Sequence, residues 1–184
     1  LAEVIDTSQS AIVRFVKKIG YRGYVDLKVD IAKSLEADND ILKDEVIAES
    51  DDIDQIIEKT KNNVLTAVDK TYTLLDVGTL ENVVNKINKN NSIYLAGVGS
   101  SGLVCEDLLY KLQRAGKIAF YQQDPHTNMA LLTNIKNEDV LICISYSGTT
   151  KEILLSVDYA KKVGATVISI TKSANNILAR ASDE

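Results

Sequence analysis

The chain has 184 residues, of which 45% are hydrophobic, and a formal net charge of −5 at pH 7. This composition supports one buried core with an accessory module, while its apolar runs are too short for a membrane span or a secretory leader. Residues 1–33 carry six basic and four acidic side chains, whereas residues 34–184 carry fifteen and twenty-two, so only the N-terminal end is expected to meet a polyanion.

Residues 1–33 predict a short helix at 1–5, a turn, and a second helix from about residue 9 to residue 19. Ser8 is suited to cap the second helix and Gly20 to end it. One face of this helix carries an apolar stripe of Ile12, Phe15, Val16 and Ile19. The opposite face carries the polar and basic residues Gln9, Ser10, Arg14, Lys17 and Lys18. This pattern fits the recognition helix of a helix-turn-helix, and a plain amphipathic hairpin is the alternative.

The same segment resembles the DNA-binding domain of RpiR-type bacterial transcriptional regulators. The matching residues are Leu1-Ala2, Ser8, Arg14-Phe15, Lys18-Ile19-Gly20-Tyr21, Gly23-Tyr24 and Leu27. The resemblance implies that operator DNA is a partner, and that the chain starts at the end of the second helix of this domain. It also implies that a sugar isomerase (SIS) domain follows.

Residues 36–50 are acidic, lack glycine and proline, and predict a linker. A helix follows from Asp51 to about Asp76, capped by Ser50 or Asp51, and a second runs from Leu80 to Lys89, capped by Thr79. The apolar stripe of the first helix suits packing within the chain or against a second copy. The predicted domains are therefore a partial helix-turn-helix at 1–35, a linker at 36–50, and a domain at 51–184.

From residue 91 the chain alternates between strand and helix patterns. Strands are expected at 92–96, 118–121, 140–145 and 165–170, and helices at 101–115, 127–133, 150–163 and 177–180. Such βα repeats predict an α/β fold with a doubly wound parallel sheet, whose ligands bind at the carboxyl ends of the strands. A fifth strand would normally follow the last helix, so we expect the sheet to be truncated.

A cluster of hydroxyl groups follows the strand at 140–145. The sequence Ser145-Tyr146-Ser147-Gly148-Thr149-Thr150 lies between this apolar strand and a helix. Helix N-termini bind anions through unpaired amides and the macrodipole, and hydroxyl groups add further donors. The sequence thus predicts an anion site, and ordinary capping of the helix by Thr149 or Ser147 is the alternative.

A glycine-rich turn follows the first strand. Gly97-Val-Gly99-Ser100-Ser101-Gly102 has the G-x-G-x-x-G spacing of a dinucleotide site, and Asp124 lies about twenty residues on. However, Gln122 and Gln123 separate Asp124 from the strand, and two serines occupy the turn. If the two strands are neighbours, the two turns meet, which suits one compact phosphate better than a dinucleotide.

Both turns, with Asp124-Pro125-His126 and the strand ending at Thr171, resemble the SIS domain of the same regulators over about residues 80–184. The resemblance implies that Ser101, Ser145, Ser147 and Thr150 bind the phosphate of a phosphosugar, with the amides of Gly148 and Thr149. Gly99, Ser100, Tyr146 and His126 complete the predicted site. It also implies a homodimer or homotetramer, with two DNA-binding units on successive half-sites.

Some SIS proteins are isomerases, which need a base to move a proton between adjacent carbons. Glu106, Glu152 and His126 are the candidates, but surface charge explains the glutamates better. We therefore expect a phosphosugar-responsive transcriptional regulator and not an enzyme, with a phosphosugar isomerase as the alternative. No cofactor or metal is expected, because Cys105, Cys143 and the single histidine fit no zinc spacing. Two reduced, buried thiols are typical of a cytoplasmic protein.

Overall fold

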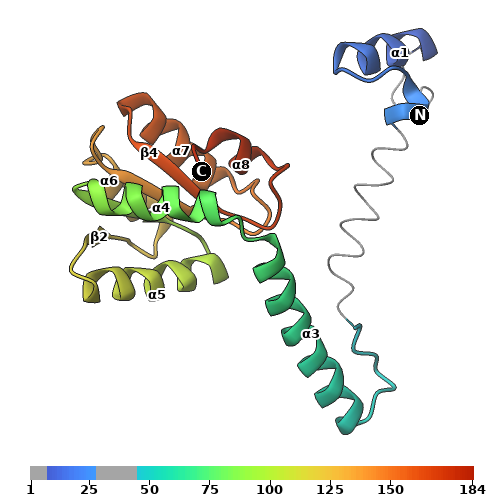
Figure 1. Cartoon of the computed structure of the whole chain (residues 1–184), viewed down its shortest axis with the longest axis horizontal. Helices are drawn as coiled ribbons and strands as arrows, with labels where there is room; N and C mark the ends of the chain where they lie inside the picture. The colour runs from blue at the N-terminus through green and yellow to red at the C-terminus, as the bar shows by residue number, and fades with distance from the viewer. Residues whose placement is uncertain (1–7, 28–44) are drawn as a thin grey trace. The chain divides into compact units, whose positions relative to one another are not determined.

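The computed structural model describes residues 8–27 and 45–184. It divides the chain into two compact units, Leu1–Leu75 and Asp76–Glu184 (Figure 1). The predicted helix at 1–5 and most of the predicted linker lie outside the described residues. The division into domains at 35/36 and 50/51 stays a prediction.

Helix α1 spans Gln9–Lys18 and begins as its sequence predicts. Ser8 caps it by accepting a hydrogen bond from the Ala11 amide at 3.2 Å, and Gly20 follows it with φ +99°. Of the predicted apolar stripe, Val16 is fully buried, whereas Phe15 is 60% exposed. Within the described residues, the stripe is therefore only partly covered.

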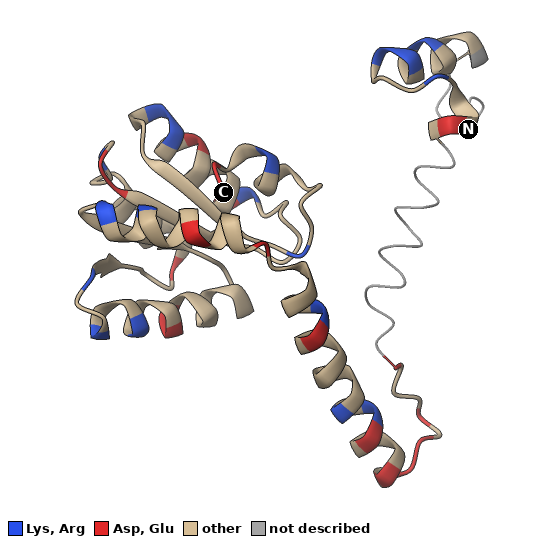
Figure 2. Ribbon diagram, viewed as in Figure 1, with Lys and Arg blue, Asp and Glu red and all other residues tan. Residues whose placement is uncertain are grey.

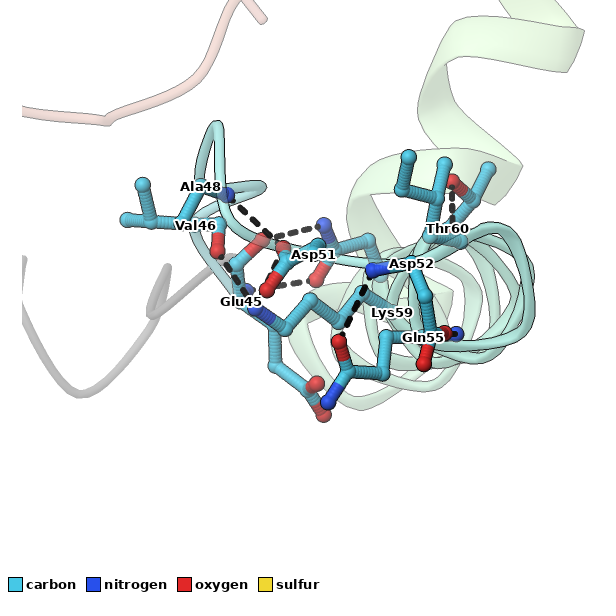
Figure 3. Close-up of polar contacts among 10 residues, drawn as sticks. Glu45, Val46, Ala48, Asp51, Asp52, Gln55, Lys59 and Thr60 are labelled. Atoms are coloured by element: carbon cyan, nitrogen blue, oxygen red, sulfur yellow. Dashed lines mark hydrogen bonds and ion pairs between the residues drawn. The ribbon is translucent and has the colours of Figure 1, made fainter.

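Helix α3 spans Ile53–Leu74 and starts with a capping box (Figure 3). The Asp52 side chain accepts from the Gln55 amide at 2.8 Å, and the Gln55 side chain accepts from the Asp52 amide at 2.9 Å. The prediction that Ser50 or Asp51 caps this helix is therefore wrong, because only residue 52 has a glutamine three positions later. Asp51 instead pairs with Lys59 at 2.7 Å, and the hydrogen bond from Lys59 lowers the pKa of its carboxyl group.

The second unit contains a four-stranded parallel sheet, which confirms the predicted doubly wound α/β fold. Its strands are β1 (Ser92–Ala96), β2 (Ile118–Phe120), β3 (Val140–Ile144) and β4 (Thr166–Ile170), in the order β2-β1-β3-β4. Every residue of β3 is buried, as its unbroken apolar sequence requires. A fifth strand is expected at the outer edge of β4. There the Asp183 amide donates to the Val167 carbonyl oxygen at 2.8 Å.

Five helices accompany this sheet. They are α4 (Val77–Lys89), α5 (Ser100–Arg114), α6 (Pro125–Leu132), α7 (Lys151–Val163) and α8 (Ile177–Ala181). Helix α4 begins three residues earlier than predicted. Its cap is Asp76, which accepts from the Thr79 amide at 2.7 Å, so the prediction of Thr79 as the cap is wrong.

The core forms two layers, one on each face of the sheet (Figure 1). Alternate residues of β1 divide between them: Ile93 and Leu95 pack with α4 and α5, whereas Tyr94 and Ala96 pack with α6, α7 and α8. This alternation is the two-residue period of a strand that is covered on both faces. The two layers fix the sheet and the helices that start at its carboxyl edge.

Candidate functional site

The two predicted turns meet where the strand order of the sheet reverses. Strands β1 and β3 are hydrogen-bonded neighbours, with Ala96 opposite Cys143. After β1 the chain crosses through α5 to β2, and after β3 it crosses through α7 to β4, in the opposite direction. Ligands of doubly wound sheets bind in the crevice at this switch point. The turns at 97–102 and 145–150 both end there.

Hydroxyl groups hold the turn between β3 and α7 together. The buried Ser145 Oγ lies 3.1 Å from Thr150 Oγ1 and accepts from the Gly148 amide at 3.2 Å. Ser147 Oγ accepts from the Thr149 amide at 3.3 Å and from the Thr149 hydroxyl at 3.1 Å. Ser147 and Thr149 are exposed, so their oxygens can also reach a ligand from solvent.

The helices at the switch point begin differently from the others that the structure describes. Helices α1, α3, α4, α6 and α8 each have an N-cap side chain that accepts a hydrogen bond from their first turn. The N-cap residues of α5 and α7 are Gly99 and Thr150, and neither accepts a side-chain hydrogen bond from the first turn. Capping of α7 by Thr149 or Ser147 is therefore wrong as an explanation of the hydroxyl cluster. The Gly102 and Ile153 amides donate to the carbonyl oxygens of Gly99 and Thr150, at 2.9 and 3.1 Å. The missing caps therefore leave the first two amides of each helix for another acceptor.

Close packing explains the glycines of the turn between β1 and α5. A β-carbon at Gly97 would lie 2.6 Å from Cys105 Sγ, and one at Gly102 would lie 2.6 Å from Tyr121 Oη. Gly99 has φ +61°, which disfavours any side chain. Ser100 and Ser101 follow as the first residues of α5, with Ser100 exposed and Ser101 half-buried.

Tyr121 and Asn128 support this turn, and neither is among the predicted residues. The buried Tyr121 hydroxyl donates to the Gly97 carbonyl oxygen at 2.9 Å. The Asn128 side chain donates to the Leu95 carbonyl oxygen at 3.0 Å and accepts from the Gln122 amide at 2.9 Å, which joins the ends of β1 and β2. A polar residue in the apolar pattern of 127–133 was the only available signal for Asn128.

The two other residues named from sequence, Asp124 and His126, lie at the start of helix α6. The Asp124 carboxylate caps α6 by accepting hydrogen bonds from the Thr127 amide at 2.8 Å and the Thr127 hydroxyl at 2.9 Å. The hydrogen bond from the Thr127 amide is the main cause of the lowered pKa of Asp124. His126 is exposed in the first turn of α6, at the carboxyl end of β2. Its contact with a sugar stays a prediction.

A third loop, between β4 and α8, contacts the turn at 145–150. The Lys172 amide donates to the Tyr146 carbonyl oxygen at 3.3 Å, and the Leu178 amide donates to the Gly148 carbonyl oxygen at 3.0 Å. Gly148 has φ +65°, and a β-carbon there would overlap the side chain of Asn176. Sequence patterns do not indicate the role of this loop, because its residues lie over twenty positions from the turn.

The remaining candidates lie apart from these contacts. Glu106 and Glu152, considered as catalytic bases, are exposed. Burial raises the pKa of the Cys105 thiol to about 12, with Glu106 adding to the effect, so this thiol is unreactive at neutral pH.

Within the described residues no group of His, Cys, Asp or Glu could hold a metal ion. Across the same residues, no helix has the length and apolar character needed to cross a membrane.

The predicted DNA-reading side chains of α1 are accessible. The side chains of Ser10, Arg14, Lys17 and Lys18 are exposed, and the structure does not describe that of Gln9. Residues 10, 14 and 18 recur every four positions, so they share one side of the helix. Figure 2 shows basic residues along α1 and charges of both signs along α3.

Comparison with known proteins identifies two domains. The SIS domain matches residues 86–184, and the helix-turn-helix domain of the rpiR family matches residues 1–38. An HTH-type transcriptional regulator of Caldanaerobacter subterraneus subsp. tengcongensis is 38% identical over 183 residues, which cover all of this chain and 64% of the relative. The chain thus spans less than two thirds of the length of that regulator.

Two solved structures are similar to this chain. The Vibrio vulnificus NanR protein complexed with ManNAc-6P has a TM-score of 0.67 and 27% identity, covering 100% of this chain and 64% of that one. The sugar isomerase domain of an RpiR transcription factor from Sphaerobacter thermophilus shares the fold, with a TM-score of 0.67 and 20% identity, covering 71% of this chain and 73% of that one. Since the SIS match covers more than half of its residues, the chain belongs to the SIS-domain family, and its N-terminal residues 1–38 match the helix-turn-helix domain of the rpiR family.

Proposed function

We propose that the chain is part of a DNA-binding transcriptional regulator whose SIS domain senses a phosphorylated sugar. In this proposal the N-terminal module at 1–35 binds operator DNA, and the domain at 51–184 binds the phosphosugar and releases it unchanged. The protein acts in the cytoplasm as a homodimer or homotetramer, so that two DNA-binding units reach two half-sites.

The absence of side-chain caps on α5 and α7 carries this proposal. Both helices begin at the switch point, beside the hydroxyl groups of Ser101, Ser147 and Thr150. Helix N-termini with unpaired amides favour an anion, and a phosphate group offers enough oxygens to accept from both turns. The names of the relatives support the same proposal, because NanR is a ManNAc-6P complex and the curated relative is a transcriptional regulator.

Two other functions fit the site less well. A dinucleotide site needs an acid for the ribose, but the Asp124 carboxylate is already engaged as the cap of α6. An isomerase needs a base near the reacting carbons, whereas Glu106 and Glu152 are exposed residues of α5 and α7. Exposed glutamates are more often surface charge than catalytic bases, which favours sensing over catalysis.

Sensing requires the ligand to bind two arrangements of the protein with different affinity. The ratio of these affinities sets how far the phosphosugar shifts operator binding. A ligand held equally well in both arrangements would bind without changing transcription. The decisive measurement therefore combines ligand affinity with DNA affinity.

Calorimetry with a panel of phosphosugars that includes ManNAc-6P, and with inorganic phosphate, tests the site. A gel shift of the protein's own promoter region tests the response. We expect Ser147→Ala and Thr150→Val to weaken phosphosugar binding by about tenfold or more, since each removes a hydrogen bond to a charged group. Both variants should keep their DNA affinity but lose the ligand response.

Thr133→Val is the matched control, because the Thr133 hydroxyl donates only to the Ala130 carbonyl oxygen at 2.7 Å, at the far end of α6. A ligand response that survives Ser147→Ala would refute the phosphate assignment. Turnover of a sugar phosphate that depends on Glu106, Glu152 or His126 would establish the isomerase instead.

A further inference from the structure

The residues predicted for the phosphate site contain no permanent positive charge. They are glycines, hydroxyl residues and His126, in a chain with a formal net charge of −5 at pH 7. A phosphate monoester carries nearly two negative charges at neutral pH. An acidic protein that binds such a dianion only through neutral hydroxyl and amide groups must also overcome its own negative field.

Lys172 is a cation fixed beside this site. Its amide donates to the Tyr146 carbonyl oxygen at 3.3 Å, and its Nζ lies 5.5 Å from the centroid of the Tyr146 ring. Tyr146 lies between Ser145 and Ser147 in the turn, and its neighbours are only about 3.8 Å away between Cα atoms. The ammonium group therefore lies against the side chain of a residue in the turn that carries the predicted phosphate-binding hydroxyls.

Three further contacts fix the loop that carries Lys172. The Thr171 hydroxyl lies 3.4 Å from the Tyr146 carbonyl oxygen, and the Asn176 Nδ2 donates to Thr171 Oγ1 at 2.6 Å. The Leu178 amide donates to the Gly148 carbonyl oxygen at 3.0 Å. Because the loop is joined to the turn on both sides of Lys172, the position of the lysine backbone relative to Ser147 is set by the fold.

We propose that Lys172, stacked on Tyr146, supplies the positive charge that selects phosphorylated over neutral sugars at the switch-point site. This inference rests on the proposed function, since it assigns a further specificity-determining residue to the same site. The Tyr146 ring restricts the lysine side chain through a cation–π contact. A restrained ammonium loses less conformational entropy on pairing with a phosphate than a free one does.

The test uses the full chain and inorganic phosphate as the probe, titrated by calorimetry at low and high salt. We expect Lys172→Gln to weaken phosphate binding about three- to tenfold at low salt, and this difference to shrink as salt screens the charge. Lys172→Arg keeps the charge and the stacking, and should bind like the unsubstituted protein. Lys162→Gln makes the same charge change in the last turn of α7, and should leave phosphate binding unchanged.

Each contrary result has a separate meaning. If the unsubstituted protein binds phosphate and Lys172→Gln binds it equally well, the role of Lys172 is refuted while the proposed function stands. Weak binding by Lys172→Arg, or an equal loss in Lys162→Gln, also refutes a local charge effect. If the unsubstituted protein binds no phosphate, the site itself and the role of Lys172 are both refuted.

Discussion

Tyr121 illustrates how a single residue governs one of the two turns. Its hydroxyl donates to the Gly97 carbonyl oxygen, and the same hydroxyl oxygen leaves no room for a side chain at Gly102. Burial raises the pKa of Tyr121 from the usual 10.0 to about 12, and the charges of Cys105 and Glu106 act in the same direction. The neutral phenol is therefore the form that the folded protein favours.

We expect Tyr121→Phe to lower the free energy of unfolding by about 1 kcal/mol at neutral pH, because a buried carbonyl oxygen loses its donor. The contribution of the phenol is complete below pH 10 and is lost as the pH rises towards the folded pKa of about 12. Urea unfolding should therefore show the gap between the two proteins closing as the pH rises from 10.0 to about 12. A gap that is constant with pH would contradict the raised pKa.

At the scale of residues, the sequence suggests candidate groups for the site but not the residues that support them. Hydroxyl and glycine residues at strand ends stand out because they interrupt apolar runs, as Ser145 and Gly148 do. Tyr121, Asn128 and Asn176 act through partners that lie from 5 to 33 positions away in the chain. No local pattern reports such contacts, so they became visible only in the folded structure.

At the scale of elements, the strands and helices of the second unit were predicted to within about three residues. The errors concern the first turns of helices, as with Asp76 in place of Thr79 and Asp52 in place of Ser50 or Asp51. In both cases an aspartate with a partner three residues later provides the cap. Several adjacent residues could cap each helix, and only the backbone geometry decides among them.

The contact between the turn at 145–150 and helix α8 gives a prediction for Gly148. We expect Gly148→Ala to destabilise the protein by about 2–4 kcal/mol, since alanine combines an unfavourable positive φ with an overlap on Asn176. Asn176 has little freedom to move, because its side chain also accepts from the Ala179 amide at 2.8 Å and caps α8.

Gly116→Ala is the matched control, because Gly116 has φ +77° but no atom within 4 Å of its would-be β-carbon. It should destabilise the protein by only about 1 kcal/mol, the effect of positive φ alone. Urea unfolding measures both variants, and equal losses would show that the overlap with Asn176 has no energetic weight.

At the scale of the whole molecule, the charge distribution separates two tasks. Residues 1–33 have an excess of two basic side chains, while the remainder of the chain has an excess of seven acidic ones. A polyanion such as DNA would therefore be attracted to one end of the sequence and repelled by the rest. The exposed side chains of Arg14, Lys17 and Lys18 belong to the attractive end.

This separation predicts how the protein binds DNA as salt increases. We expect Lys18→Gln to reduce the slope of log affinity against log salt concentration by about one, with a similar loss for all DNA sequences. Fluorescence anisotropy with promoter DNA and with unrelated DNA measures both effects. Lys162→Gln in α7 should leave the slope unchanged. An equal change of slope in this variant would contradict the proposal that the N-terminal residues bind DNA.

The parallel sheet followed from the alternation of strands and helices, but the order of its strands did not. Four parallel strands can be arranged in several ways that keep right-handed crossovers, and hydrophobic patterns are the same in each. The pairing of β1 with β3, which brings the two turns together, depends on contacts between Ile93, Leu95 and residues over forty positions away. The meeting of the turns was therefore a hypothesis from sequence and became a fact of the fold.

The helices that begin without caps have a practical consequence for work with this protein. Uncapped amides at a helix N-terminus donate hydrogen bonds to any small tetrahedral anion, whatever group the anion carries. Phosphate and sulfate buffers would then fill the site, raise the melting temperature by mass action, and conceal the effect of a true effector. Purification and ligand screening in cationic amine buffers would keep the site empty, and a melting temperature that rises with added phosphate would be the first sign of the site.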